Sequence, residues 1–351
     1  MGDGLRFISL ILDIIKFQTN RGVLLNEKAL LEVRNLKTYF HTPGGVLRAV
    51  DDVSFVANRG ETLGIVGESG SGKSVTCLSI LRLVQTPPAK YEGGDIVFDG
   101  HDILKMDKNK LLELRGGRIA MIFQEPMVAL NPVYTIANQL KEAMRLHKTV
   151  SREEADERAL ELLRQVRIPN AEKILNSYPF TLSGGMRQRV MIAMALSCKP
   201  DLLIADEPTT ALDVTIQAQI LNLINQLKEE SGSGVIFITH DLGVISEIAD
   251  RTMVMYAGKV CESAITDELI FDPHHPYTQG LIASKPSGLT TDGNRLKVIP
   301  GNVPSLLNKP SGCPFHPRCS HRESICSEEF PKTTMVKPGH MVACWQYSSN
   351  G

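Results

Sequence analysis

Several features that would identify a particular class of protein are scarce or absent in the sequence. It carries one tryptophan among 351 residues, and aromatic residues make up 5% of the chain. Basic and acidic residues nearly cancel, 38 against 39, so no global basic surface for nucleic acid is expected. No run of about 18 apolar residues occurs, so no membrane-spanning helix is expected. Residues 7–15 are apolar but contain Asp13 and lack an A-x-A-like cleavage site, which favours a short docking helix, or an extension upstream of the folded part, over a secretory signal.

A glycine-rich stretch at residues 67–74 fits the G-x-x-x-x-G-K-[ST] pattern of a phosphate-binding loop. The apolar residues 63–66 predict a strand before it, and residues 74–84 predict a helix after it. The glycines let the backbone turn its N–H groups towards phosphate, and the helix adds its positive N-terminal end. We expect Lys73 to reach the β- and γ-phosphates and Ser74 to ligate Mg²⁺. The expected nucleotide contacts in the loop are Gly67, Ser69, Gly70, Ser71, Gly72, Lys73 and Ser74.

Polar residues also follow three other apolar strands. Asp206 and Glu207 end one predicted strand, His240 ends another, and Gln124 follows a third. Asp206 could hold Mg²⁺ through water, and Glu207 could orient or deprotonate an attacking water molecule. His240 could donate a hydrogen bond to a γ-phosphate, and Gln124 is at a strand end that lies near nucleotide in doubly wound sheets.

Between these strands lies a region with helical periodicity and no strand, residues 132–177, in which Ser151 and Glu154 form a capping box. We expect an inserted helical subdomain there. A Ser-Gly-Gly turn, Ser183 to Gly185, then precedes an apolar helix at residues 190–197. Such a turn could be a second anion site, although on its own the signal is weak.

In this order the motifs resemble those of the ATP-binding subunits of ABC transporters, over about residues 30 to 284. The resemblance implies that two such domains dimerise head to tail, with each ATP between one phosphate-binding loop and the partner's Ser-Gly-Gly turn. It assigns catalysis to Glu207, His240 and Gln124, and Mg²⁺ binding to Ser74, Gln124 and Asp206. Contact with the partner's nucleotide is assigned to Ser183, Gly184, Gly185, Gln188 and Asp213. Contact with the chain's own ATP is assigned to Val50 and to Phe40, with Tyr39 as the alternative to Phe40.

The resemblance is more specific in four places. Residues 183–196 and 206–215 are similar to the D-type ATPase of oligopeptide and dipeptide importers, and so are His275-Pro276-Tyr277-Thr278 and residues 312–319. It implies a paralogous F-type ATPase subunit, two transmembrane permease subunits and an extracytoplasmic peptide-binding protein as partners, at the cytoplasmic face of the membrane. The N-terminal extension before about Glu27 departs from this family.

Two other functions compete with peptide import. A nickel importer ATPase shares much of the pattern. A soluble ABC ATPase acting in translation or DNA repair is a different class, which tends to carry two nucleotide domains or a long coiled-coil insertion, and the sequence shows neither.

Cysteine is concentrated near the end of the chain, where four of the seven lie: Cys313, Cys319, Cys326 and Cys344. The intracellular setting implied by an ATPase disfavours disulfides. Four thiolates can hold zinc or an iron–sulfur cluster, and their spacing does not match the C-x₂₋₄-C knuckle of zinc ribbons. The family resemblance also points to a [4Fe–4S] cluster. The alternatives are Zn²⁺, with histidines as substitute ligands, and free thiols.

The expected fold is α/β: a P-loop NTPase core, with a RecA-like mixed sheet and an antiparallel β subdomain, plus an inserted helical subdomain and a small Cys-rich C-terminal module. The expected boundaries are an N-terminal extension at 1–28, a nucleotide-binding domain at 29–286 with its helical subdomain at about 126–182, and the C-terminal module at 287–351.

Overall fold

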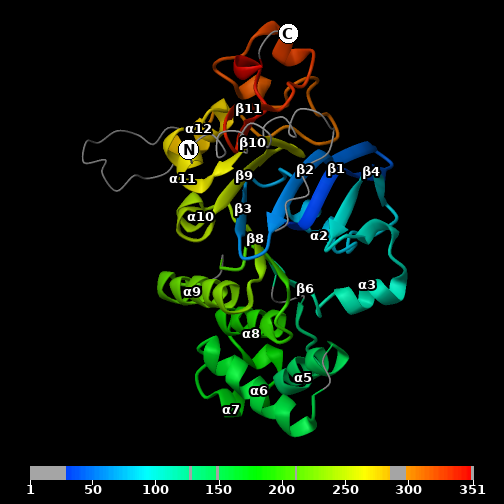
Figure 1. Cartoon of the computed structure of the whole chain (residues 1–351), viewed down its shortest axis with the longest axis vertical. Coiled ribbons are helices and arrows are strands. Elements are labelled where there is room, and N and C mark those ends of the chain that lie inside the picture. The colour runs from blue at the N-terminus through cyan, green and yellow to red at the C-terminus, as the bar shows by residue number, and fades with distance from the viewer. Residues whose placement is uncertain (1–28, 126–128, 148–149, 210–211, 285–297, 349–351) are drawn as a thin grey trace, which may run out of the picture.

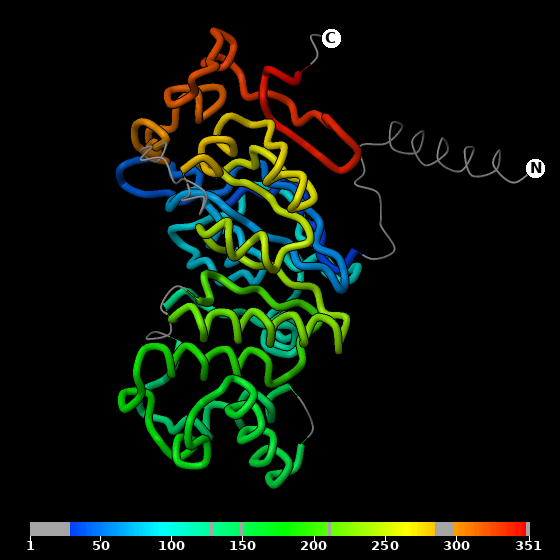
Figure 2. Tube along the Cα trace, turned by 90° about the vertical axis from the view of Figure 1, so that its left-hand side faces the viewer, coloured from blue at the N-terminus to red at the C-terminus, as the bar shows by residue number. Residues whose placement is uncertain are grey.

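The computed structural model describes residues 29–125, 129–147, 150–209, 212–284 and 298–348. The N-terminal extension therefore lies outside the described residues, as do the expected start of the helical subdomain and the expected boundary before the C-terminal module. Within the described residues, the helices α5 to α7 and the Cys-rich module lie at opposite ends of the long axis, with two β-sheets between them (Figures 1 and 2).

The larger sheet has eight strands in the order β11-β12-β10-β9-β3-β8-β7-β6. Five neighbouring strands run parallel: β3 (Thr62–Val66), β6 (Ile119–Ile122), β7 (Leu202–Asp206), β8 (Gly234–Ile238) and β9 (Arg251–Tyr256). Every residue of β3, β7 and β8 is buried, which is typical of parallel strands covered on both faces. The mixed sheet predicted from the sequence is confirmed, and the carboxyl ends of its parallel strands carry the predicted site residues.

The smaller sheet is antiparallel, in the order β2-β1-β4-β5. Its strands are β1 (Ala29–Thr42), β2 (Gly45–Asn58), β4 (Ala89–Phe98) and β5 (His101–Asp102), followed by the 3₁₀ turn η1 (Ile103–Lys105) and α3 (Lys108–Leu114). Its apolar face packs on the larger sheet and on α2 (Lys73–Ile80), forming one continuous core. β4 pairs with β1 as far as Phe40, where Ala89 lies opposite it.

The helix after the phosphate-binding loop is shorter than predicted. We expected it to reach residue 84, but α2 ends at Ile80. Arg82 has a positive φ of 50°, and the N–H of Leu83 hydrogen-bonds the carbonyl of Leu78 at 2.8 Å. This left-handed closure stops the helix before its apolar pattern ends.

The predicted helical segment is formed by α5 (Ile136–His147), α6 (Arg152–Gln165) and α7 (Ala171–Leu175). The hydroxyl of Ser151 caps α6 by accepting the N–H of Glu154 at 3.1 Å, as the sequence predicts. The remaining helices are α8 (Gly184–Leu196), α9 (Val214–Ser231), α10 (Leu242–Ile248), α11 (Thr266–Phe271) and α12 (Pro276–Ala283), with the 3₁₀ turn η2 (Pro179–Thr181) before α8. α8 starts at the Ser-Gly-Gly turn itself, earlier than the helix predicted at 190–197, because Ser183 caps it.

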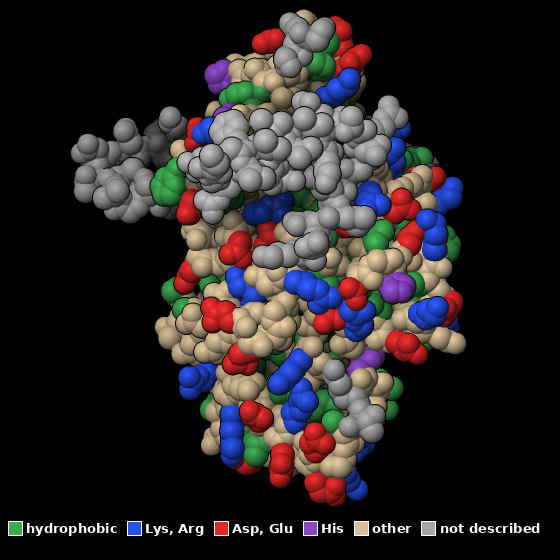
Figure 3. All heavy atoms as spheres, in the orientation of Figure 1, with side chains coloured by type: hydrophobic (Ala, Val, Ile, Leu, Met, Phe, Trp, Pro, Cys, Tyr) green, Lys and Arg blue, Asp and Glu red, His purple; other side chains and the backbone are tan. Residues whose placement is uncertain are grey.

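The C-terminal segment adds strands to the larger sheet, which the sequence did not predict. β10 (Lys259–Ile265) pairs antiparallel with β9 on one side and with β12 (His340–Val342) on the other, and β12 pairs with β11 (Thr334–Lys337). The cysteines lie before and after this hairpin, in a segment with three short 3₁₀ turns: η3 (His316–Arg318), η4 (Ser324–Ser327) and η5 (Trp345–Tyr347). On the face seen in Figure 3, acidic and basic side chains are interspersed.

Candidate nucleotide-binding and catalytic site

The phosphate-binding loop connects β3 to α2 and is held against the neighbouring strands. At Gly67, φ is 154° and an added Cβ would lie 2.2 Å from the carbonyl oxygen of Met255; at Gly72, φ is 101° and a Cβ would lie 2.4 Å from that of Ala49. Only glycine fits these two positions. Lys73 is 6% exposed, and its Nζ donates to the carbonyl of Gly67 at 2.7 Å, which keeps the ammonium within the curl of the loop.

A buried carboxyl group lies beside this loop at the end of β7. Asp206 is 3% exposed, and its Oδ1 has no hydrogen-bond partner among the described residues. Burial raises the pKa of the Asp206 carboxyl, and a hydrogen bond with Ser74 opposes that rise. A buried carboxylate oxygen without a partner, next to a hydroxyl, is a donor set that suits Mg²⁺, so Asp206 and Ser74 fit the predicted metal.

The three residues predicted to be catalytic come together at three strand ends. Nε2 of Gln124 donates to Oε2 of Glu207 at 3.3 Å, and Nδ1 of His240 lies 3.2 Å from Oε1 of Glu207. Glu207 has a positive φ of 48°, uncommon for a residue with a side chain, and its N–H is bonded to the carbonyl of Ile238 at 2.9 Å. The side chain of His240 is 62% exposed, whereas that of Glu207 is 13% exposed. An acceptor for a water proton is thus held between two exposed polar side chains.

The Ser-Gly-Gly turn is exposed at the start of α8. The hydroxyl of Ser183 accepts the N–H of Met186 at 3.3 Å. Among the described residues, none would contact a Cβ on Gly184, and only Leu212 would contact one on Gly185. Because Ser183 and Gly184 are exposed, the start of α8, where the first N–H groups lack intrahelical partners, is accessible. Gln188, by contrast, is buried and donates to the carbonyl of Pro208.

Asp213 lies at the start of α9, where it caps the helix by accepting the N–H of Ile216 at 2.9 Å. It is exposed, as are Ser183 and Gly184. Of the five residues predicted to contact a partner's nucleotide, Gln188 is the one that is buried. Its side chain joins α8 to the loop after Glu207.

The residues predicted to contact the rest of the nucleotide differ in how far their side chains are buried. Phe40 and Tyr39 are both half-buried on β1. The hydroxyl of Tyr39 donates to Asp51 at 2.7 Å and Arg48 lies over its ring, 5.6 Å from the centroid, so this ring already has partners. Val50 is fully buried in β2, which leaves its side chain no surface for a ligand. Phe40 is thus the aromatic residue better able to receive an adenine ring.

The four C-terminal cysteines line one small cavity. Cys313, Cys319, Cys326 and Cys344 converge on a space of about 20 Å³, together with His275, His316 and His321. The other three cysteines, Cys77, Cys198 and Cys261, are buried in the core. Burial raises the pKa of the Cys313 and Cys344 thiols to about 11. Four thiols gathered around a cavity fit a metal centre, since a metal would stabilise their thiolate forms.

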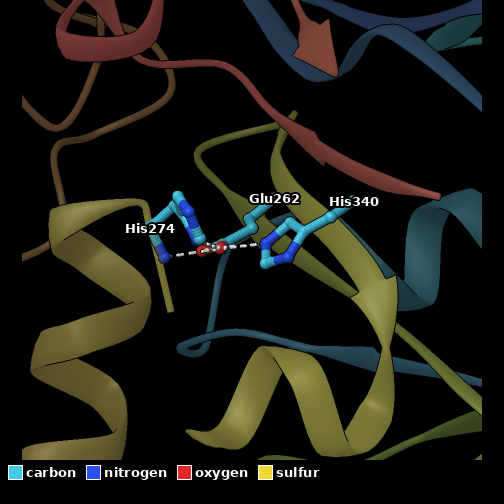
Figure 4. Close-up of side chains that lie close together, drawn as sticks. All are labelled: Glu262, His274 and His340. Carbon is cyan, nitrogen blue, oxygen red and sulfur yellow. Dashed lines mark hydrogen bonds and ion pairs between the residues drawn. The ribbon is translucent and has the colours of Figure 1, made fainter. Parts of the chain in front are cut away.

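A second group with metal-ligand chemistry holds the C-terminal hairpin to the sheet (Figure 4). Among the described residues, only Glu262, His274 and His340 place three ligand atoms all within 4.8 Å of one another. Both carboxylate oxygens of Glu262 are already in use: Oε1 accepts the N–H of His274 and lies 2.7 Å from Nε2 of His340, and Oε2 accepts the N–H of His275. We therefore interpret this group as a hydrogen-bonded anchor. His340 belongs to it and does not line the cysteine cavity.

Two contacts at the site were not predicted from the sequence. Glu68, in the phosphate-binding loop, is bound by Tyr277 and Arg318, which lie 209 and 250 residues further along the chain. No local pattern marks either residue as part of a nucleotide site.

Comparisons with known families agree with this geometry. Residues 50–210 match the model of the family described as ABC transporter, and residues 261–326 match that described as the oligopeptide/dipeptide transporter, C-terminal region. Among solved structures, the ATP-binding cassette MJ0796, in a dimeric post-hydrolysis state with ADP and phosphate, is 29% identical with a TM-score of 0.62. That match covers 67% of this chain and 98% of the other. The fold and site thus define an ATP-binding-cassette ATPase.

Relatives with similar sequences identify the family more specifically. The chain is 53% identical to a probable peptide ABC transporter ATP-binding protein of Sinorhizobium fredii, over 92% of this chain and 96% of the relative. It is 50% identical to the oligopeptide transport ATP-binding protein AppD of Bacillus subtilis, over 92% and 98%, and 49% identical to OppD of Salmonella typhimurium, over 90% and 93%. The chain belongs to the family of oligopeptide and dipeptide transporter ATP-binding proteins. Among the described residues, no helix is long and apolar enough to cross a membrane.

Proposed function

We propose that this chain hydrolyses ATP to power the import of di- or oligopeptides across the cytoplasmic membrane. The observation that carries the hydrolysis is the position of Glu207, held between Gln124 and His240 and next in sequence to the buried Asp206. The relatives named for peptide transport and the matching C-terminal region support peptide as the solute.

In the proposed reaction, a water oxygen bonds to the γ-phosphorus as the bond to the bridging oxygen of ADP breaks. The water proton passes to the carboxylate of Glu207, Gln124 orients the water, and His240 donates a hydrogen bond to the γ-phosphate. Mg²⁺, held by Ser74 and Asp206 with Gln124, would neutralise phosphate charge when bound. Lys73 supplies a further positive charge beside the β- and γ-phosphates.

The exposed Ser-Gly-Gly turn supports a composite site. Among the described contacts, none joins Ser183, Gly184 or Gly185 to the catalytic group of their own chain, and Ser183 and Gly184 are exposed. We infer that they bind the nucleotide of a second ATPase subunit, with Asp213 at the same interface, and that this partner is a paralogous F-type subunit. The dimeric state of the cassette MJ0796 is a precedent for such pairing.

An apolar groove supports docking of a permease. It has a volume of about 320 Å³, lies between β6, the end of α2 and the helices α5 and α8, and is lined by apolar side chains that include Leu83, Met121, Phe123, Met191 and Met194. Leu83 and Phe123 are more than a third exposed. We propose that a short helix of each of two transmembrane permease subunits fits such a groove, one per ATPase subunit. This places the chain as a peripheral subunit at the cytoplasmic face, with the peptide-binding protein acting through the permease.

We propose further that the four C-terminal cysteines hold a [4Fe–4S] cluster. All four cysteines line one cavity, and four cysteine thiolates are the ligands that such a cluster takes. The cluster would serve as a structural centre that closes several loops of the tail.

Reconstitution tests the function. The chain is inserted with its second ATPase subunit, permeases and binding protein into lipid vesicles, and ATP-dependent uptake of a labelled dipeptide is compared with uptake of Ni²⁺, with Glu207→Gln as the inactive control. Peptide uptake that stops in the control supports the proposal. Uptake of Ni²⁺ alone would favour the nickel importer, and full ATPase activity that no membrane partner alters would favour a soluble ATPase.

A further inference from the structure

The C-terminal tail contacts the phosphate-binding loop directly. Arg318 lies in η3, one residue before Cys319, and Glu68 is the second residue of the loop. Nη1 of Arg318 lies 2.7 Å from Oε2 of Glu68, and Nη2 lies 3.2 Å from Oε1. We propose that Arg318 is a positioning residue for ATP binding, which fixes and neutralises Glu68 so that the loop keeps its phosphate-binding shape. The inference rests on the proposed ATPase function.

The guanidinium of Arg318 has little freedom to leave this position. Its side chain is 6% exposed, Nε donates to the carbonyl of Pro300 at 2.8 Å, and Nη1 also lies 3.3 Å from the hydroxyl of Tyr256. The group lies near the rings of Tyr256 and Phe315, at 5.8 and 6.0 Å from their centroids. A planar guanidinium group that is held by this many contacts imposes a single geometry on the carboxylate that it binds.

The backbone of Glu68 is fixed from the same side of the loop. Its N–H donates to the hydroxyl of Tyr277 at 2.8 Å, and Tyr277 is fully buried at the start of α12. The ring of Tyr277 packs edge-on against Tyr256, and both contact Phe315, which precedes Arg318 by three residues. Phe315 of the tail, Tyr256 of β9 and Tyr277 of α12 thus form one aromatic cluster.

The geometry of Glu68 bears on ATP through its carbonyl group. That carbonyl accepts from Nζ of Lys73 at 3.1 Å and from the N–H of Ser71 at 3.1 Å, two groups expected to bind phosphate. The Glu68 carboxylate is also a negative charge close to where a triphosphate binds, and without Arg318 it would repel that ligand. Loss of Arg318 should therefore weaken ATP binding by two routes, a displaced loop and an unpaired carboxylate.

A double-mutant cycle in the full chain tests this role. We expect Arg318→Gln to raise the KM for ATP and the Kd for a fluorescent ATP analogue on the order of 10-fold, with a smaller change in kcat. Arg318→Lys keeps the positive charge but loses the two parallel N–H donors of the guanidinium, so its KM for ATP should lie between those of the parent and of Arg318→Gln. Glu68→Gln added to Arg318→Gln should restore much of the affinity, because it removes the unpaired charge.

The matched control is Lys337→Gln. Lys337 also joins the tail to the core, by an ion pair with Asp272, but neither residue belongs to the phosphate-binding loop. This variant should leave KM unchanged. The proposal is overturned if Arg318→Gln binds ATP as the parent does, or if Glu68→Gln brings no recovery, since a merely structural defect of the tail would not be repaired by a change in the loop. The Kd measurement needs no turnover, so a chain that binds ATP without hydrolysing it would contradict the proposed function and not this inference.

Discussion

Nδ1 of His240 lies 3.2 Å from Oε1 of Glu207, although the two residues end different strands, β8 and β7. The contact places the exposed histidine at the carboxylate proposed to take up the water proton. It also explains why Glu207 tolerates a positive φ, because its N–H is bonded to β8 as well. The position of the proton acceptor is therefore set by pairing between two parallel strands.

Glu207→Gln should keep the shape of this group while removing the proton acceptor. We expect ATP to bind and turnover to fall by on the order of 10²-fold or more, which steady-state phosphate release measures. The matched control is Glu229→Gln, the same change at an exposed position on α9, which should keep normal turnover. Near-normal hydrolysis by Glu207→Gln would rule out Glu207 as the base.

A bulky residue at Gly185 should act on the partner's nucleotide. We expect Gly185→Trp to leave ATP affinity of the isolated chain within about twofold and to abolish ATP-driven dimerisation, because the turn is exposed at the start of α8, where we propose that the partner's nucleotide binds. Lys73→Ala is the comparison: it should abolish binding in the isolated chain. Calorimetry and size-exclusion chromatography with ATP distinguish the two variants. Collapse of monomer binding in Gly185→Trp would place the turn in its own chain's site.

The cysteine cavity can be tested by its metal content. Anaerobically purified protein should be brown, with about four irons per chain. Cys319→Ser should bleach it and increase proteolysis of the tail, whereas Cys198→Ser, at a buried core thiol, should keep the colour. Colourless protein with one zinc per chain, even when made without oxygen, would replace the cluster by a zinc site.

Asp51 should make stability depend on pH at the acid end. Burial alone would raise the pKa of this carboxyl, but the hydrogen bond from Tyr39 and the charges of Lys309 and Lys259 bring it down to about 2. A lowered pKa in the folded state means that the stabilisation is complete above the unfolded pKa of about 3.9 and is lost as the pH falls towards 2.

We therefore expect Asp51→Asn to lower the free energy of unfolding by about 1–2 kcal/mol at neutral pH, with the difference shrinking between about pH 4 and pH 2. Urea unfolding at several pH values measures it. Asp52→Asn, one residue along the same strand but exposed, serves as the control and should show a smaller difference. A difference for Asp51→Asn that stays constant down to pH 2 would contradict the ion-pair explanation.

The parallel strands and the site at their carboxyl ends could be predicted because both depend on local signals. Continuous apolar runs marked β3, β7 and β8, and each was followed by residues with recognisable chemistry. What could not be predicted depends on pairing between distant segments. β12 has three residues, too few for a periodicity, and it joins the sheet through β10 about 80 residues earlier. Arg318 reaches Glu68 across 250 residues in the same way, through tertiary packing alone.

The short hairpin at the end of the chain also covers the backbone of β10. Without β12, the larger sheet would end at β10 with a row of unpaired N–H and C=O groups, and the N–H of Ala343 would no longer bond the carbonyl of Cys261. Exposed edge strands of this kind pair with other chains and lead to aggregation. Removing the tail would therefore affect solubility as well as the cysteine centre. The tail that reaches the phosphate-binding loop also closes the sheet against self-association.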